Sequence, residues 1–422
     1  MTEAKQIRVV WVIGQGYVGL PVAMASVEVG FEVTGIDLDN RRVELLSSGK
    51  SPTPDVPNTK LQEALDQGSY AVTSRYPTNS GFDVAVITVP TPLKDGLPDL
   101  TFIESAAHSV GASVRSGCTV ILESTSYPGT TEELLVPILE QESGLIAGED
   151  FYVGYSPERI DPGNEKWDLL NTPKVVSGVN GRSRERVSAF YITLGIETVL
   201  VSGTREAEMT KLLENTFRHV NIALVNELAI FSQALGVDIW EAIDAASTKP
   251  FGFMKFSPGP GVGGHCLPVD PSYLSWAIKN KAGKSFKFVE LANEVNGHMP
   301  HYVVSRVESL LAKDKKGLSR STVLLLGLAY KANTSDIRES PAIVLATLLQ
   351  NAGATVYAID DFVSDENWPL NVMRHQAENE VAYDVAVLTT DHQDSTSESA
   401  LNLIPRILDT RNVLSNDNVE KL

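Results

Sequence analysis

The sequence predicts an α/β protein with two parallel-sheet domains joined by a long central helix. Short apolar runs alternate with helical patterns over the first 125 residues, and the same alternation returns beyond residue 315. Between these regions, residues 206–235 form one helical pattern without glycine or proline. Alternating strands and helices are typical of parallel sheets that are covered on both faces.

The N-terminal region contains four strand-like runs rich in Val and Ile and bounded by Gly, Pro or Asp. These runs predict strands at residues 9–13, 32–37, 83–89 and 119–124. The intervening patterns predict helices at residues 17–30 and 102–114. This order matches a doubly wound sheet.

The central pattern has apolar residues at three- and four-residue steps, such as Met209, Leu212, Leu213, Phe217, Val220 and Leu224. Gly236 is a suitable stop signal. We expect this helix to bury its apolar stripe against the flanking domains or a second subunit. Residues 248–265 are rich in Gly, Pro and Phe and predict a loop. The last region predicts strands at 322–328, 355–360 and 385–389 and a helix at 342–353.

The chain has 422 residues, which suggests two or three domains. We place domains at residues 1–205, 206–314 and 315–422. The net charge of −18 argues against a nucleic-acid-binding protein, which needs a basic face. The two cysteines fit no metal-binding spacing, and we find neither an apolar run of membrane length nor a signal peptide. These features predict a cytoplasmic protein. The seven histidines show no HxxxH or HExxH spacing, so we expect no catalytic metal.

A glycine motif follows the first predicted strand and opens a helix. It reads Gly14-Gln15-Gly16-Tyr17-Val18-Gly19, which is GxGxxG. Gly14 permits a tight turn, Gly16 lets the backbone approach a pyrophosphate, and Gly19 allows close packing of helix and strand. Asp37 ends the second strand, where its carboxylate can accept a hydrogen bond from a ribose 2′-OH. The motif therefore predicts a Rossmann-like dinucleotide site that favours NAD over NADP.

Cys266 follows the glycines of the loop in GVGGHC, whereas Cys118 lies beside an apolar run. A thiol near free backbone N–H groups is a candidate nucleophile, and a thiol beside an apolar run is typically structural. Asp270 lies between two prolines, where it is either a site residue or the cap of the following helix.

Other polar residues lie at positions that suit a site. Lys211 and Asn215 are one turn apart on the central helix, either as a solvated edge or as a cation and a dipole for an oxyanion. Thr125 follows a strand at the carboxyl edge of the sheet, where open α/β sheets bind ligands. Glu158-Arg159, Lys331 and Arg338 lie in polar turns, and by themselves these turns do not distinguish site residues from exposed charges.

Together these motifs resemble the UDP-glucose/GDP-mannose dehydrogenase family. The resemblance covers essentially the whole chain and keeps the family's order of motifs. They are GQGYVGLP, VPTP, STSYPGTT, SPER, KLLENTFRHVNIALVNE, GVGGHCLPVDP, GLAYKANTSDIRES and DTRN. The family fold is two Rossmann-like domains joined by a long central helix, and the resemblance implies a homodimer formed through that helix. It also implies oxidation of C6 of a nucleotide sugar to a carboxylate with two NAD+, which serves polysaccharide biosynthesis.

The resemblance implies roles for individual residues. Cys266 resembles the nucleophile that captures the C6 aldehyde as a thiohemiacetal, which is then oxidised to a thioester. Lys211 and Asn215 resemble the oxyanion-stabilising pair, and Asp270 the carboxylate near the attacking water. Glu158 resembles the carboxylate of proton transfer, and Thr125 the hydroxyl that orients water or substrate. Further positions resemble cofactor contacts (Arg42, Thr91, Arg338) and contacts to the UDP-sugar (Arg159, Gly261, Lys331, Arg411).

The sequence departs from the UDP-glucose branch of that family. Pro162 occupies a position that is acidic there, and the thiol motif reads GGHC rather than GGYC or GGSC. These features resemble the UDP-N-acetylhexosamine 6-dehydrogenase branch, and FVELANEVN at 288–296 favours UDP-N-acetylglucosamine over UDP-N-acetylmannosamine. Two alternatives are a two-electron hydroxy-acid dehydrogenase, which shares the Lys-x-x-x-Asn pair, and an inactive module that binds NAD or a UDP-sugar.

Overall fold

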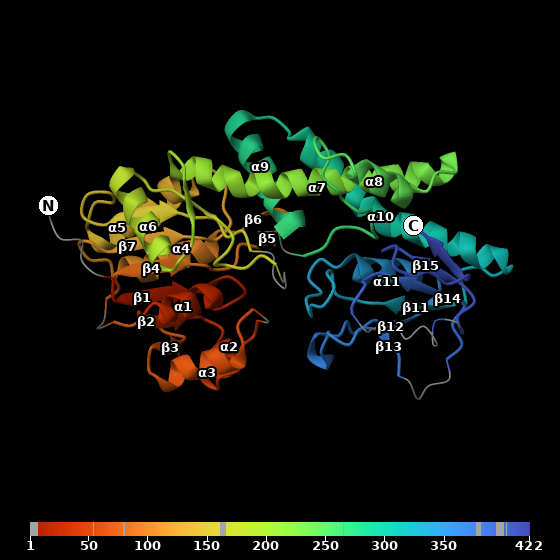
Figure 1. The fold of residues 1–422 in the computed structure, drawn as a ribbon, viewed down its shortest axis with the longest axis horizontal. Coiled ribbons are helices and arrows are strands. Elements are labelled where there is room, and N and C mark those ends of the chain that lie inside the picture. Colours follow the sequence, from red (N-terminus) through yellow and green to blue (C-terminus); the bar gives the residue numbers. More distant parts are fainter. Residues whose placement is uncertain are drawn as a thin grey trace. The chain divides into compact units, whose positions relative to one another are not determined.

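The computed structural model forms two compact units, residues 1–214 and 215–422 (Figure 1). It describes residues 7–53, 55–78, 81–160, 166–264, 266–376, 381–393, 401 and 403–422. The side chain of Cys266 lies outside this description, as does all of Pro162. Each unit contains one six-stranded parallel sheet. The long helix α7, Thr204–Leu235, begins in the first unit and ends in the second.

The N-terminal unit alternates strands and helices, as the spacing of its apolar runs predicts. Its strands are β1 (Val9–Ile13), β2 (Glu32–Ile36), β3 (Tyr70–Thr73), β4 (Val84–Ile87), β5 (Leu93–Lys94), β6 (Leu97–Pro98), β7 (Thr119–Leu122), β8 (Tyr152–Tyr155), β9 (Lys174–Val176) and β10 (Thr198–Leu200). Its helices are α1 (Gly19–Glu28), α2 (Asn40–Ser47), α3 (Asn58–Asp66), α4 (Thr101–Gly111), a π-helical turn (Thr131–Leu135), α5 (Val136–Ser143) and α6 (Gly181–Thr193).

The sheet of this unit has the strand order β3-β2-β1-β4-β7-β8. Successive side chains of a strand face opposite sides of the sheet. Val10 and Val12 pack with residues of α1, α3 and α6, whereas Trp11 and Ile13 pack with residues of α4 and α5. Both faces of β1 are therefore buried, which explains why its sequence, VVWVI, is apolar without alternation.

The C-terminal unit repeats this architecture after a helical segment. Its further helices are α8 (Ile239–Ser247), α9 (Cys266–Ala282), α10 (Lys287–Lys313), α11 (Pro341–Asn351) and a 3-10 turn (Asp365–Asn367). Its strands are β11 (Thr322–Leu326), β12 (Thr355–Ile359), β13 (Met373–Arg374), β14 (Val385–Leu388), β15 (Ile407–Asp409) and β16 (Val419–Lys421).

The second sheet has the order β13-β12-β11-β14-β15-β16, which is the order of the first sheet. Val323 and Leu325 pack with residues of α10 and α11, and Leu324 packs on the other face with Leu401 and Ile404. The expected fold class, two Rossmann-like sheets and a long helix, is confirmed. The three-domain division stays a prediction.

One of the two alternatives for Asp270 does not hold. Asp270 does not cap a helix that begins after it, because α9 already begins at Cys266 and includes Pro271 in its second turn. Gly236, with a φ of +67°, follows the last residue of α7, as the stop signal predicts.

Candidate active site

The glycine-rich turn lies between β1 and α1 in the N-terminal unit. Gly14 has a φ of +92°, and a Cβ there would lie 2.5 Å from the carbonyl oxygen of Thr88. A Cβ on Gly19 would lie 1.9 Å from the carbonyl oxygen of Gly14. A Cβ on Gly16 would meet nothing within 4 Å. Gly14 and Gly19 therefore serve packing, while Gly16 leaves space at the positive end of α1 for a pyrophosphate.

Asp37 lies at the end of β2, beside this turn. Its Oδ2 accepts hydrogen bonds from the backbone N–H of Gln15 at 2.8 Å and from Arg42 Nη1 at 3.0 Å. Its Oδ1 accepts one from the backbone N–H of Asp39 at 3.0 Å. A carboxylate can accept about four hydrogen bonds. These described contacts leave capacity for a ribose hydroxyl, so the turn and Asp37 fit a dinucleotide.

The other expected cofactor residues of this unit follow the carboxyl ends of strands or directly precede α1. Thr91 is buried after β4, and Thr125 is half-buried after β7. Tyr17 and Val18 immediately precede α1 and are partly exposed. All of them belong to the unit that carries the glycine-rich turn.

The loop after Thr125 is held by Glu208, a residue that sequence reasoning missed. Glu208 lies on α7 and is fully buried. Its carboxylate accepts hydrogen bonds from the backbone N–H groups of Gly129 at 2.6 Å and Thr131 at 2.8 Å, and from the Thr131 hydroxyl at 2.7 Å. Burial raises the pKa of Glu208 to about 7, against the effect of these donors. The sequence feature that could have revealed Glu208 is an acidic residue at a position of an amphipathic helix that is expected to be buried.

Glu158 and Lys211 meet in the structure. The Lys211 ammonium donates to the carbonyl oxygen of Glu158 at 2.6 Å. The Glu158 Oε1 accepts from the backbone N–H groups of Arg159 and Ile160 at 2.6 and 2.7 Å, and its Oε2 from Lys174 Nζ at 2.8 Å. Burial opposes ionisation, but Lys174 and these donors hold the pKa of Glu158 below its ordinary value. Glu158 is thus a buried carboxylate.

Lys174, Glu123 and Tyr191 extend this group, and the sequence did not single them out. Lys174 Nζ lies 3.3 Å from Glu123 Oε2, and the Tyr191 hydroxyl donates to Glu123 Oε1. Glu123 directly follows β7, and Lys174 begins β9. Charged residues at the ends of apolar strands were the signal that could have found them.

Arg159 is engaged with α7. Its guanidinium contacts Glu214 at 2.7 Å and donates to the carbonyl oxygen of Pro173 at 2.7 Å. The structure therefore shows Arg159 linking the Glu158 loop to the long helix. Its expected contact with substrate stays a prediction.

Asn215 and Asp270 form a second buried pair, in the C-terminal unit. Asn215 lies one turn beyond Lys211 on α7, and its Nδ2 donates to Asp270 Oδ2 at 2.5 Å. Asp270 is fully buried, and Asn215 is nearly so. Asp270 lies in the second turn of α9, the helix that begins with Cys266.

The loop before Cys266 requires its glycines. A Cβ on Gly263 would lie 2.7 Å from Tyr330 Cβ, and one on Gly264 would lie 2.7 Å from the Tyr330 ring. Gly264 also has a φ of +85°, and its N–H donates to the carbonyl oxygen of Arg338 at 3.0 Å. Gly261 has a φ of +139°, so its backbone conformation also favours glycine. The backbone of this loop thus packs against the second Rossmann-like fold.

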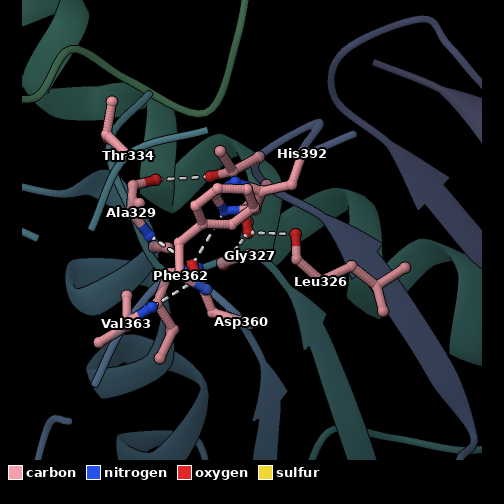
Figure 2. Close-up of polar contacts among 12 residues, drawn as sticks. Leu326, Gly327, Ala329, Thr334, Asp360, Phe362, Val363 and His392 are labelled. Carbon is pink, nitrogen blue, oxygen red and sulfur yellow. Dashed lines mark hydrogen bonds and ion pairs between the residues drawn. The ribbon is translucent and has the colours of Figure 1, made fainter. Parts of the chain in front are cut away.

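The second Rossmann-like turn reproduces the geometry of the first but uses its carboxylate differently (Figure 2). Asp360 follows β12 as Asp37 follows β2. Its Oδ2 accepts from the backbone N–H groups of Leu328 and Ala329 and from His392 Nε2, at 2.7, 2.9 and 3.0 Å. Its Oδ1 accepts from two more backbone N–H groups, those of Phe362 and Val363. The hydrogen-bond-accepting capacity of the Asp360 carboxylate is therefore fully used, so Asp360 cannot bind a ribose hydroxyl as Asp37 can.

The remaining expected cations lie in the C-terminal unit. Arg411 donates from Nε to the carbonyl oxygen of Thr389 at 2.7 Å, and a Cβ on Gly259 would lie 3.0 Å from its Nη1. Lys331 follows Tyr330 in the turn that packs on the loop, and it is half-buried. Arg338 is exposed and forms an ion pair with Asp336 at 2.6 Å. Arg411 and Tyr330 thus lie beside the loop that contains Gly261 and precedes Cys266.

Comparisons with known proteins agree with this architecture. The family models of the UDP-glucose/GDP-mannose dehydrogenase family match the NAD binding domain at residues 8–194, the central domain at 205–298 and the UDP binding domain at 324–416. The chain belongs to this family. The expected family is confirmed, and so is the NAD cofactor. The protein is an NAD-dependent nucleotide-sugar dehydrogenase.

Several relatives of this dehydrogenase act on N-acetylated sugars by name. The chain is 35% identical to a UDP-N-acetyl-D-mannosamine dehydrogenase of Pyrococcus horikoshii, over 92% of this chain and 90% of the relative. It is 37% identical to a UDP-N-acetyl-D-glucosamine 6-dehydrogenase of Pseudomonas aeruginosa, over 93% and 92%. A solved UDP-D-ManNAc dehydrogenase from Pyrococcus horikoshii has a TM-score of 0.88 at 33% identity, over 98% of both chains. In the part of this dehydrogenase that the structure describes, no helix is long and apolar enough to cross a membrane.

Proposed function

We propose that this dehydrogenase oxidises C6 of a UDP-N-acetylhexosamine to the uronic acid, with UDP-N-acetylglucosamine as the favoured substrate. The observation that carries the proposal is that two α7 residues one turn apart each contact a residue that carries a carboxylate. Lys211 donates to the backbone carbonyl oxygen of Glu158, and Asn215 donates to the carboxylate of Asp270. A cation, an amide and two carboxylates are the groups needed to hold an oxyanion and to move protons.

The chemistry of two successive oxidations requires a covalent tether, because a free aldehyde would leave the site. When held by the glycine-rich turn and Asp37, NAD+ would supply the hydride acceptor for each oxidation. Between them, the Cys266 thiolate attacks the aldehyde carbon, and the new C–S bond holds the sugar as a thiohemiacetal. After the second oxidation, water attacks the thioester carbon, the C–S bond breaks, and the carboxylate product and the thiolate separate. Lys211 and Asn215 stabilise the oxyanions, Asp270 orients the water, and Glu158 accepts protons.

The remaining site residues bind and orient the two ligands. Thr125 orients water or substrate, while Arg42, Thr91 and Arg338 contact the cofactor. Arg159 and Gly261 contact the substrate, and Lys331 and Arg411 contact its UDP part. The UDP binding domain at 324–416 supports the assignment of the last two residues.

The choice among sugars rests on sequence features and relatives. The relatives include dehydrogenases of N-acetylmannosamine, N-acetylglucosamine and N-acetylgalactosaminuronic acid derivatives, so an N-acetyl group is what their names share. The segment 288–296 favours the N-acetylglucosamine substrate. UDP-N-acetylmannosamine and UDP-glucose are the alternatives.

We also propose that the enzyme is a cytoplasmic homodimer, that residues 206–314 form the dimer-forming domain, and that its product enters polysaccharide biosynthesis. An exposed apolar stripe on α7 supports the dimer. Leu224, Phe231 and Leu235 are 53%, 54% and 75% exposed. Apolar side chains that recur on one face of a long helix suit a partner helix.

The test is to count NADH formed per sugar at completion with UDP-N-acetylglucosamine, UDP-N-acetylmannosamine, UDP-glucose and GDP-mannose. Two NADH with UDP-N-acetylglucosamine support the proposal. Two NADH with another sugar would correct the substrate, and one NADH with release of an aldehyde or keto product would remove the Cys266 tether. Ligand-dependent melting shifts without NADH from any sugar would favour an inactive binding module.

The nucleophile has its own test. Cys266→Ser and Cys266→Ala should lower the rate of acid formation by roughly 10³-fold or more, because no covalent tether forms. Cys118→Ser is the matched control, since Cys118 is 3% exposed in the core of the N-terminal unit. Undiminished turnover by Cys266→Ala would contradict the covalent route.

A further inference from the structure

A buried polar cluster lies behind Glu158 in the N-terminal unit. Its members are Glu123, Lys174, Tyr191 and Glu158. Tyr191 is fully buried, and Glu123 and Lys174 are 2% and 3% exposed. They come from α6, the end of β7 and the start of β9. Burying charged groups costs free energy unless they are paired, so such a cluster calls for an explanation.

The ammonium of Lys174 is shared between two carboxyl groups. It lies 2.8 Å from Glu158 Oε2 and 3.3 Å from Glu123 Oε2. The Tyr191 hydroxyl donates to the other oxygen of Glu123. One positive charge therefore faces two groups that can each be negative, so ionisation of one changes the charge balance at the other.

The electrostatics of the two carboxyl groups differ. Burial raises the pKa of Glu123 to about 7, although Lys174 and Tyr191 oppose the increase and Glu158 adds to it. Glu158 has backbone donors and the Lys211 charge in addition to Lys174, and its pKa is below its ordinary value. Glu123 is thus the member that changes charge near neutral pH, while Glu158 stays a carboxylate.

We propose that Glu123 is a positioning residue that sets the base strength of Glu158 through their shared Lys174. When Glu123 carries a proton, Lys174 neutralises Glu158 alone, and Glu158 is a weak base. When Glu123 releases its proton to solvent, the Lys174 charge is divided between two carboxylates, and Glu158 binds a proton more strongly. This inference rests on the proposed function, which assigns proton transfer to Glu158.

The charged and titratable groups that face Glu123 are known from its contacts. They are Lys174 from β9, Tyr191 from α6 and Glu158 from the loop after β8. The pKa of Tyr191 is raised well above its ordinary value by burial and by Glu123, and that of Lys174 is raised because its two carboxylates outweigh burial. Both keep their protons near neutral pH, which leaves Glu123 as the group that titrates.

Glu123→Gln tests the proposal because glutamine has the same shape and cannot ionise. The wild-type kcat should rise with an ionisation near neutral pH. In Glu123→Gln this rise should be absent, and kcat above neutral pH should be lower by several-fold, with about tenfold as the upper limit for a one-unit fall in the pKa of a general base. KM for sugar and for NAD should stay within about threefold, because Glu123 contacts Glu158 only through Lys174. If Glu123→Gln shows the same pH-dependent rise and the same kcat as the wild type, the proposal is overturned.

Glu208→Gln is the matched control. Glu208 is also buried in the same unit, with a pKa raised to about 7, but its described contacts are Gly129, Thr131 and Ser126. The rise in kcat should therefore persist in this variant. Loss of the rise in Glu208→Gln, with retention in Glu123→Gln, would assign the ionisation to Glu208 and overturn the proposal.

Two further variants keep the test decisive if Glu123→Gln folds poorly. Tyr191→Phe removes a hydrogen bond that lowers the pKa of Glu123, so the rise in kcat should move to higher pH. Glu123→Asp keeps an ionisable group and should restore a pH-dependent rise. If the rise in kcat occurs at the same pH in Tyr191→Phe as in the wild type, the proposal is contradicted.

An infrared titration of the ligand-free protein gives a readout that is independent of turnover. The carbonyl band of protonated carboxylic acids at neutral pH should lose intensity in Glu123→Gln, and a band that does not change would count against the proposal. If the wild-type enzyme forms no NADH from any nucleotide sugar, the proposed function fails. If it is active and Glu123→Gln keeps the wild-type pH profile, the function stands and this inference fails.

Discussion

The carboxylate of Glu208 on α7 accepts both the backbone N–H and the hydroxyl of Thr131, at 2.8 and 2.7 Å. Thr131 is the last residue of the STSYPGTT segment and begins the π-helical turn Thr131–Leu135. The first N–H groups of a helical segment lack partners within it, and a carboxylate near them is favourable. The first turns of α7 are thereby joined to the loop that carries Thr125.

Removing this carboxylate should destabilise the N-terminal unit. Glu208→Ala leaves buried N–H and hydroxyl groups without their acceptor, so we expect the free energy of unfolding to fall by about 3 kcal/mol in urea unfolding experiments. Glu206→Ala is the control, because Glu206 is exposed on the same helix, and its effect should stay within about 0.5 kcal/mol. Equal effects of both substitutions would show that the contact contributes no stability.

Asp37 should determine the affinity for NAD. Asp37→Ala removes the acceptor for a ribose hydroxyl, so KM for NAD should increase on the order of 10- to 100-fold with little change in kcat. Asp39→Ala is the control. Asp39 accepts a hydrogen bond from the Arg41 N–H at the start of α2, and its loss should cost about 1 kcal/mol of stability without changing KM. Unchanged KM in Asp37→Ala would exclude Asp37 from the cofactor site.

The loop before Cys266 should not tolerate a side chain at Gly264. Gly264→Ala would place a Cβ 2.7 Å from the Tyr330 ring at a φ of +85°. The displaced loop should lower kcat on the order of 100-fold, while NAD binding measured by calorimetry persists. Gly283→Ala is the control, since Gly283 has a φ of +64° with nothing within 4 Å of its Cβ. That control should lose about 1 kcal/mol of stability and keep its kcat. Wild-type kcat in Gly264→Ala would mean that the loop adapts.

Asp360 should make the C-terminal unit sensitive to acid. Burial alone would raise its pKa, but His392 and two backbone N–H groups lower it to about 2. Because the folded-state pKa is below the unfolded value, the stabilisation is complete above about pH 4 and is lost as the pH falls through about 2. In urea unfolding, Asp360→Asn should lose roughly 2 kcal/mol at pH 6, and its difference from the wild type should shrink below pH 3.

Asp361→Asn is the control for Asp360, because Asp361 is the adjacent exposed carboxylate. Its effect should stay within about 0.5 kcal/mol. A difference between Asp360→Asn and wild type that does not depend on pH would contradict the assigned ionisation.

The sequence predicted the strands and turns that local chemistry specifies. Apolar runs such as VVWVI predicted β1, and the expected strands near residues 83–89 and 322–328 are present as β4 and β11 with shorter ends. Proline was a weaker guide. One of the two alternatives for Asp270, between Pro268 and Pro271, was the cap of a following helix, but α9 begins four residues earlier. A proline in an early turn is tolerated when the rest of the helix packs, so its position does not by itself define the start.

The fold class and NAD as the cofactor could be predicted from the sequence alone, because they depend on short-range periodicity and on the spacing of glycines and Asp37 within one βαβ unit. The family followed from the resemblance of eight ordered motifs along the chain. The tertiary structure decided which polar residues meet. Lys174 lies 16 and 51 residues from its two carboxyl partners, Asn215 lies 55 from Asp270, and Glu208 lies 77 from Thr131. Such pairs form only when packed elements bring distant strand ends and helix turns together, and burial then gives Glu123 a pKa of about 7 that no local motif encodes.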